Sequence, residues 1–68
     1  MVDQGSVTSF DADAGLGEIE DDSGAIYGFH CTAIAGGSRQ IEIGKAVAFI
    51  VEAGGPGRWE ATRVTPLD

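Results

Sequence analysis

Residues 45–52 read KAVAFIVE, and this stretch carries the clearest secondary-structure signal in the chain. Its bulky apolar residues recur at every second position, so a β-strand would place Val47, Phe49 and Val51 on one face. Gly44 precedes the stretch and the glycine-rich residues 54–57 follow it, as is typical of turns. These features predict a strand over residues 45–52 with one buried face.

Four weaker apolar segments lie around this strand, separated by clusters of Gly, Asp and Ser. We expect strands over residues 5–10, 17–21, 25–30 and 59–65, a hairpin turn at 22–24, and a short helical turn at 32–34. The side chains expected to point inward are Val7, Ile19, Tyr27, Phe29, Ala61 and Val64. Five short strands with a longer glycine-rich connection between the third and fourth predict a closed or nearly closed barrel, because closure removes exposed strand edges.

The length and charge of the chain limit its organisation and its partners. We expect the 68 residues to form one domain, residues 1–68. Eleven acidic residues against four basic ones give a formal charge of −7. Such a chain lacks the clustered Lys and Arg that neutralise phosphates, and it repels a polyanion at long range. Alternatively, the acidity serves only to keep the protein dissolved.

The cysteine content and the N-terminus indicate a cellular setting. Cys31 is the single cysteine, so no disulfide forms within the chain and a reducing cytoplasm is expected. Residues 1–4 lack the basic and apolar regions of a signal peptide, and no apolar run approaches the ~20 residues that span a bilayer. We therefore expect a complete small cytoplasmic protein without a membrane segment.

Four segments, in order and at the expected spacing, resemble the cold-shock domain family. That family opens with G-x-V-K-W-F-N-x-x-K-G-F-G-F-I, and residues 5–19 here read GSVTSFDADAGLGEI. The family's V-F-V-H-F-S-A-I corresponds to YGFHCTAI at residues 27–34. Its L-x-x-G-x-x-V-x-F corresponds to IEIGKAVAF at 41–49, and its A-x-N-V to ATRV at 61–64. The resemblance implies an all-β, five-stranded antiparallel OB-fold barrel that binds single-stranded DNA or RNA.

The departures from this pattern concentrate on the positions that contact nucleic acid in the family. The family's aromatic rings and lysines at that face are replaced by Thr8, Ser9, Ala14, Leu16, Glu18, Gly28, Cys31 and Ser38. Stacking contributes roughly 1–3 kcal/mol per base, whereas micromolar affinity requires about 8 kcal/mol in total. Losing six rings therefore predicts weak or altered binding.

The remaining candidates for nucleic-acid contact are few. Phe10 and His30 keep rings on that face, and Arg39 keeps a basic residue in the long loop. Arg58 and Trp59 are adjacent at a loop–strand junction, where they could form a displaced stacking site; the alternative for Trp59 is packing. We expect any binding to use these five residues.

The alternative function is an acidic protein-interaction module for a basic partner. Its candidate residues crowd the first hairpin and are Glu18, Glu20, Asp21 and Asp22. Such a patch would speed association with a cationic protein, although a solvated hairpin explains the same residues.

No constellation typical of an enzyme, a metal site or a cofactor is present in the sequence. His30 and Cys31 are adjacent, so on a strand they would point to opposite faces. The partly apolar face left by Leu16 and Cys31 is compatible with a monomer or a weak homodimer.

Overall fold

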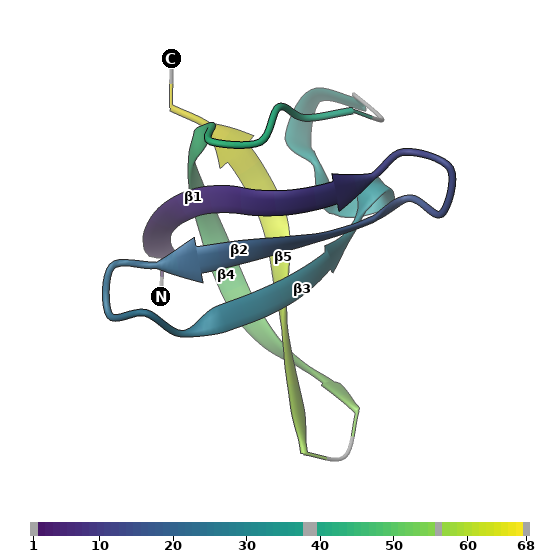
Figure 1. The fold of residues 1–68 in the computed structure, drawn as a ribbon. Helices are drawn as coiled ribbons and strands as arrows, with labels where there is room; N and C mark the ends of the chain where they lie inside the picture. The colour runs from purple at the N-terminus through teal and green to yellow at the C-terminus, as the bar shows by residue number, and fades with distance from the viewer. Residues whose placement is uncertain (1, 38–39, 56, 68) are drawn as a thin grey trace.

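The computed structural model describes residues 2–37, 40–55 and 57–67, and its strands form one closed barrel (Figure 1). The strands are β1 (Val2–Asp11), β2 (Leu16–Asp21), β3 (Ile26–His30), β4 (Ala46–Gly55) and β5 (Arg58–Pro66). Their order around the barrel is β1-β2-β3-β5-β4, and pairing between β1 and β4 completes the ring. This all-β barrel confirms the predicted OB-fold architecture.

One seam of the barrel is parallel, although the resemblance implied antiparallel pairing. β3 and β5 run in the same direction and pair at Gly28 and Glu60, and a bridge between Ile34 and Val64 lies further along the same seam. The reason is topological: a closed ring of five strands cannot alternate direction all the way round. One parallel seam is therefore a necessity of closing this barrel.

Two strands extend well beyond the segments that the sequence predicted. β1 starts at Val2 rather than at residue 5, because its first residues pair with β4 as far as Ile50. β4 continues to Gly55, and together with the start of β5 it forms a hairpin that projects from the barrel (Figure 1). Pairing with a neighbouring strand sets these ends, and no apolar alternation marks them.

Two 3₁₀ turns, η1 (Cys31–Ala33) and η2 (Ala35–Gly37), follow β3. The first lies one residue earlier than the helical turn expected at 32–34. No helix in the described part of the chain has the length and apolar character needed to cross a membrane.

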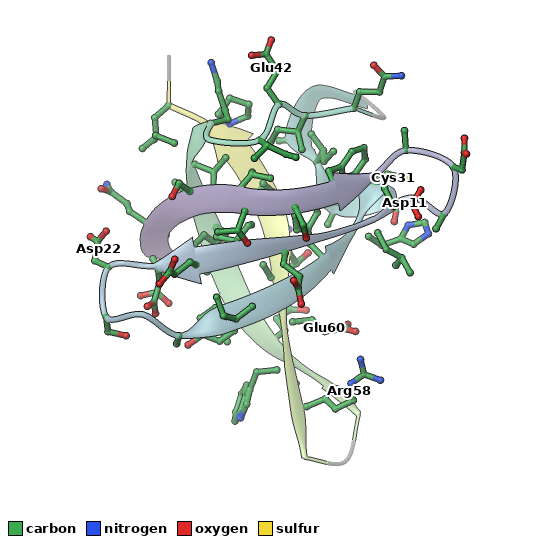
Figure 2. All side chains as sticks on the ribbon, viewed as in Figure 1. Asp11, Asp22, Cys31, Glu42, Arg58 and Glu60 are labelled. Atoms are coloured by element: carbon green, nitrogen blue, oxygen red, sulfur yellow. The ribbon has the colours of Figure 1, made fainter. Side chains whose placement is uncertain are left out.

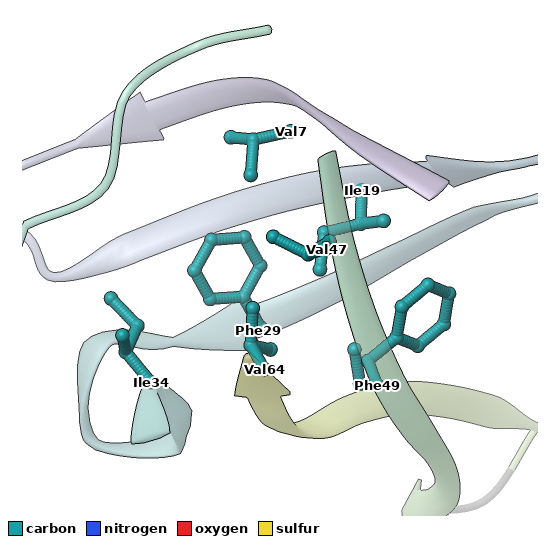
Figure 3. Close-up of a cluster of buried hydrophobic side chains, with 8 residues drawn as sticks. Val7, Ile19, Phe29, Ile34, Val47, Phe49 and Val64 are labelled. Carbon is teal, nitrogen blue, oxygen red and sulfur yellow. The ribbon is translucent and has the colours of Figure 1, made fainter. Parts of the chain in front are cut away.

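The core lies inside the barrel and contains residues from all five strands (Figure 3). Its buried members are Val7, Ile19, Phe29, Ile34, Val47, Phe49, Ala61 and Val64. All of the predicted inward residues lie here except Tyr27 and Val51. Tyr27 is half-buried at the edge of the cluster, with its ring centroid 5.8 Å from that of Phe49. Val51 is also half-buried and packs against the cluster.

A bulge in β5 explains how Ala61 and Val64 both face the core although they are three residues apart. The register between β4 and β5 shifts between Ala48 and Ile50, which places one extra residue on β5. Arg63 takes a positive φ of 51° at this point. The bulge therefore restores the inward direction of Val64 after the odd spacing.

We predict that trimming one methylene from the core costs far more than the same change outside it. Ile19 is 0% exposed and Ile26 is 50% exposed, so they form a matched pair. Ile19→Val should lower the free energy of unfolding by about 0.5–1.5 kcal/mol, and Ile26→Val by less than about 0.5 kcal/mol. Urea unfolding followed by circular dichroism measures both, and equal losses would contradict the assigned core.

Candidate nucleic-acid interface

A shallow groove of about 470 Å³ lies on the outer face of the barrel, where β2, β3 and β5 meet. We call it the Gly28 groove; its lining consists of Ser9, Leu16, Gly17, Glu18, Gly28, Phe29, His30, Arg58 and Glu60. Five of these residues occupy positions where the cold-shock pattern has residues that contact nucleic acid. The groove therefore coincides with the face at which the family resemblance predicts contact with nucleic acid, and Ser9, Glu18 and Gly28 stand there in place of aromatic residues of the family pattern.

Two glycines shape this groove for different reasons. A Cβ on Gly17 would lie 2.6 Å from the Phe29 ring and 2.8 Å from the Ser9 carbonyl oxygen, so only glycine lets Phe29 pack against β2. A Cβ on Gly28 would meet no atom closer than the Gly17 carbonyl oxygen, at 3.9 Å. Gly17 is thus required by core packing, whereas Gly28 leaves space that a side chain could fill.

His30 lines the groove at the end of β3, and its ring is fixed by the following turn. Its Nδ1 accepts a hydrogen bond from the Thr32 backbone N–H at 3.2 Å. In the neutral ring the proton is then on Nε2, which is free to donate. Cys31 does not point away as expected: its Sγ lies 3.8 Å from Nδ1, because β3 ends at His30 and the chain turns.

The other predicted nucleic-acid contacts are dispersed. Phe10 is half-buried and stacks on Phe29 with ring centroids 6.0 Å apart, so most of it belongs to the edge of the core. Arg58 lines the groove, whereas Trp59 does not and is 61% exposed. Neighbours on a strand point to opposite faces, so Arg58 and Trp59 do not share one stacking surface. Arg39 lies outside the described residues.

The acidic candidates also separate into different surroundings. Glu18 and Glu20 are exposed on either side of the buried Ile19, and Asp22 is exposed in the turn that follows β2 (Figure 2). Asp21 is half-buried, and its carboxylate accepts hydrogen bonds from the Ser23 backbone at 2.9 Å, the Ser23 hydroxyl at 2.7 Å and the Ala25 backbone at 2.9 Å. All three hydrogen bonds end on Oδ1, so this oxygen of Asp21 serves the turn.

A row of glutamates that the sequence did not predict crosses the sheet at the groove. In the strand register, Glu18 pairs with Gly28, Gly28 with Glu60, and Glu60 with Glu52. We call Glu18, Glu60 and Glu52 the glutamate row. Adjacent strands are about 4.8 Å apart, so the Cα atoms of Glu18 and Glu60 stand roughly 10 Å apart across Gly28. No pattern in the sequence marks this grouping, because the β3–β5 seam creates it.

The two carboxylates beside Gly28 lean away from each other. Glu18 accepts a hydrogen bond from the Ser9 hydroxyl at 3.3 Å, on the β1 side. The Glu60 carboxyl group lies over Gly54, where any side chain would collide with it. Like charges facing one another across strands repel. This arrangement keeps the Gly28 groove open between them.

The family-model comparison identifies the class of protein to which this chain belongs. The model described as "'Cold-shock' DNA-binding domain" matches residues 3–67, which is nearly the whole chain. The chain therefore belongs to the cold-shock domain family, whose members are nucleic-acid-binding modules. None of the curated proteins compared with it matches significantly.

The described part of the chain contains no candidate metal site. There, no three side chains of His, Cys, Asp or Glu converge in a way that could hold a metal ion. Cys31 is a free, half-buried thiol packed against the core.

We predict that Asp21 stabilises the fold only in its ionised form. The Ser23 hydroxyl above all, with the backbone N–H groups of Ala25, Ser23 and Gly24, lowers the pKa of this carboxyl below 3.8, against a smaller opposing effect of desolvation. Its contribution is therefore present above pH 3.8 and is lost as the pH falls through the lowered pKa.

The test compares Asp21→Asn with the wild type by urea unfolding across this pH range. Asp21→Asn should be less stable near neutral pH, and the two proteins should converge in acid. Asp22→Asn is the matched control and should follow the wild type throughout. A stability gap that persists below the lowered pKa would contradict the role of the carboxylate charge.

Proposed function

We propose that the protein is a cold-shock module that binds single-stranded nucleic acid weakly, through the Gly28 groove rather than through a platform of aromatic rings. The observation that supports this proposal is the position of the groove on the family's nucleic-acid face. His30 and Arg58 supply hydrogen-bond donors there, and the exposed Leu16 supplies apolar surface.

Energetics support the weakness of this binding. Each lost ring forfeits roughly 1–3 kcal/mol of stacking, and Glu18 places a carboxylate where a base would lie. Arg58 is the one Lys or Arg in the groove lining, so release of phosphate counterions contributes little. We expect affinities for short oligonucleotides weaker than micromolar, and lower still in added salt.

Gly28→Phe tests this proposal by restoring one ring at the centre of the groove. The space around Gly28 admits a side chain, so the variant should fold and should bind short DNA or RNA about 5- to 150-fold more tightly, the equivalent of one stacked base. The measurement is chemical-shift mapping with a salt titration, with Ile43→Phe as a control at an exposed site outside the groove. Absence of groove shifts in both the wild type and Gly28→Phe at high protein and low salt would overturn the proposal.

A second candidate function is an acidic protein-interaction module. The observation that favours it is the exposure of Glu18, Glu20 and Asp22 on a chain of net charge −7. The double variant Glu18→Lys/Glu20→Lys should lose association with a purified basic protein while keeping the barrel's circular-dichroism spectrum. Unchanged association after this reversal would count against the candidate.

We further propose that the protein works in a reducing cytoplasm and is a monomer or a weak homodimer. The free thiol of Cys31 is compatible with that compartment. The exposed apolar side chain of Leu16, 54% accessible beside the groove, is compatible with weak self-association.

A further inference from the structure

We propose that the Gly28 groove is a docking site for a lysine or arginine side chain carried by a basic segment of a partner protein. This inference rests on the second candidate function, but it assigns the interaction to a different part of the surface. The docking centre becomes Gly28, between Glu18 and Glu60, rather than the β2–β3 turn.

The shape of the groove suits a long side chain with a charged end. The exposed Leu16 supplies apolar surface at the groove, and Gly28 leaves the space above the sheet empty. The methylene stem of Lys or Arg covers apolar surface readily while its charged head stays at a polar rim. In the groove lining a planar base would meet the His30 ring at one end, because Phe29 is buried in the core.

The charge around the groove favours a cation over a phosphate. Glu18 and Glu60 stand on opposite sides of Gly28, and Glu52 lies next to Glu60 in the row. Within the described residues, none of these three glutamates forms a salt bridge. Arg58 is the first residue of β5 and lies on the projecting hairpin (Figure 2). The groove lining thus carries two carboxylates and one guanidinium.

A cation above Gly28 would also reduce the repulsion between carboxylates in the folded protein. The Glu52 and Glu60 side chains face each other across β4 and β5, and like charges so placed destabilise a sheet. A positive group between Glu18 and Glu60 would offset that repulsion. Binding and stability should therefore rise together, which distinguishes this site from a surface patch far from other charges.

The test uses a fluorescein-labelled hexalysine peptide and a counterpart in which every side-chain amine is acetylated. Glu18→Gln/Glu60→Gln removes both carboxylates from the groove. Glu20→Gln/Asp22→Asn removes the same charge from the nearby hairpin, outside the groove lining. Anisotropy at low ionic strength gives the affinity of each protein, and amide chemical shifts locate the peptide.

We expect hexalysine to shift the amides around Gly28 and the acetylated peptide to leave them unchanged. The groove variant should weaken hexalysine binding about tenfold, and the hairpin variant less than about threefold, because two close carboxylates outweigh two distant ones. Gly28→Phe should fill the hollow and also weaken peptide binding. The wild type, and not the groove variant, should gain thermal stability with the peptide.

Three results would overturn the inference. Equal losses of hexalysine affinity in the two double variants would mean that the peptide is attracted by the net charge alone. The second candidate function would then remain possible, but the Gly28 groove would not be its site. If hexalysine does not bind at all, both the groove site and the second candidate function are wrong. Oligonucleotides that shift the groove amides where hexalysine does not would assign the groove to nucleic acid, as in the first proposal.

Discussion

The pairing of Gly28 with Glu60 is the constraint on which the rest of the structure depends. It joins β3 to β5 and so closes the barrel around its core. The same pairing carries the register from Glu18 on β2 to Glu52 on β4. One seam therefore determines both how the apolar interior is enclosed and which outward side chains become neighbours.

The inward positions of this barrel keep the residue types of the family pattern, whereas many outward positions do not. Inward positions keep apolar residues, because the core in the described part of the chain consists of only eight buried side chains. Outward positions around Gly28 have lost rings and gained a carboxylate at Glu18 without disturbing that core. Alternation along the strands separates the two faces, so the surface can change its ligand chemistry while the fold persists.

Much of the fold was predictable from local pattern, and much of the candidate site was not. Alternation of apolar and polar residues identified Ile19, Val47 and Phe49 as core, because the buried face of a strand can be predicted from that strand's own sequence. The bulge at Arg63 escaped prediction because no apolar pattern marks the shift of register between β4 and β5. The parallel seam escaped prediction because it arises from closure, which involves residues far apart in sequence. Glu60 was missed for the same reason. The local role of Asp21 was within reach, because an Asp before Ser and Gly commonly accepts turn hydrogen bonds.

The glutamate row makes the stability of the protein depend on the salt concentration. Folding brings Glu18 close to Glu60 and Glu52 of the β4–β5 hairpin, so the native state concentrates negative potential that the unfolded chain spreads out. Dissolved ions screen such potential over about 8 Å at physiological ionic strength, close to the spacing of the row. Salt should therefore act on this small barrel as a weak, nonspecific stabilising ligand, and a dilute medium should leave its closing seam at its least stable.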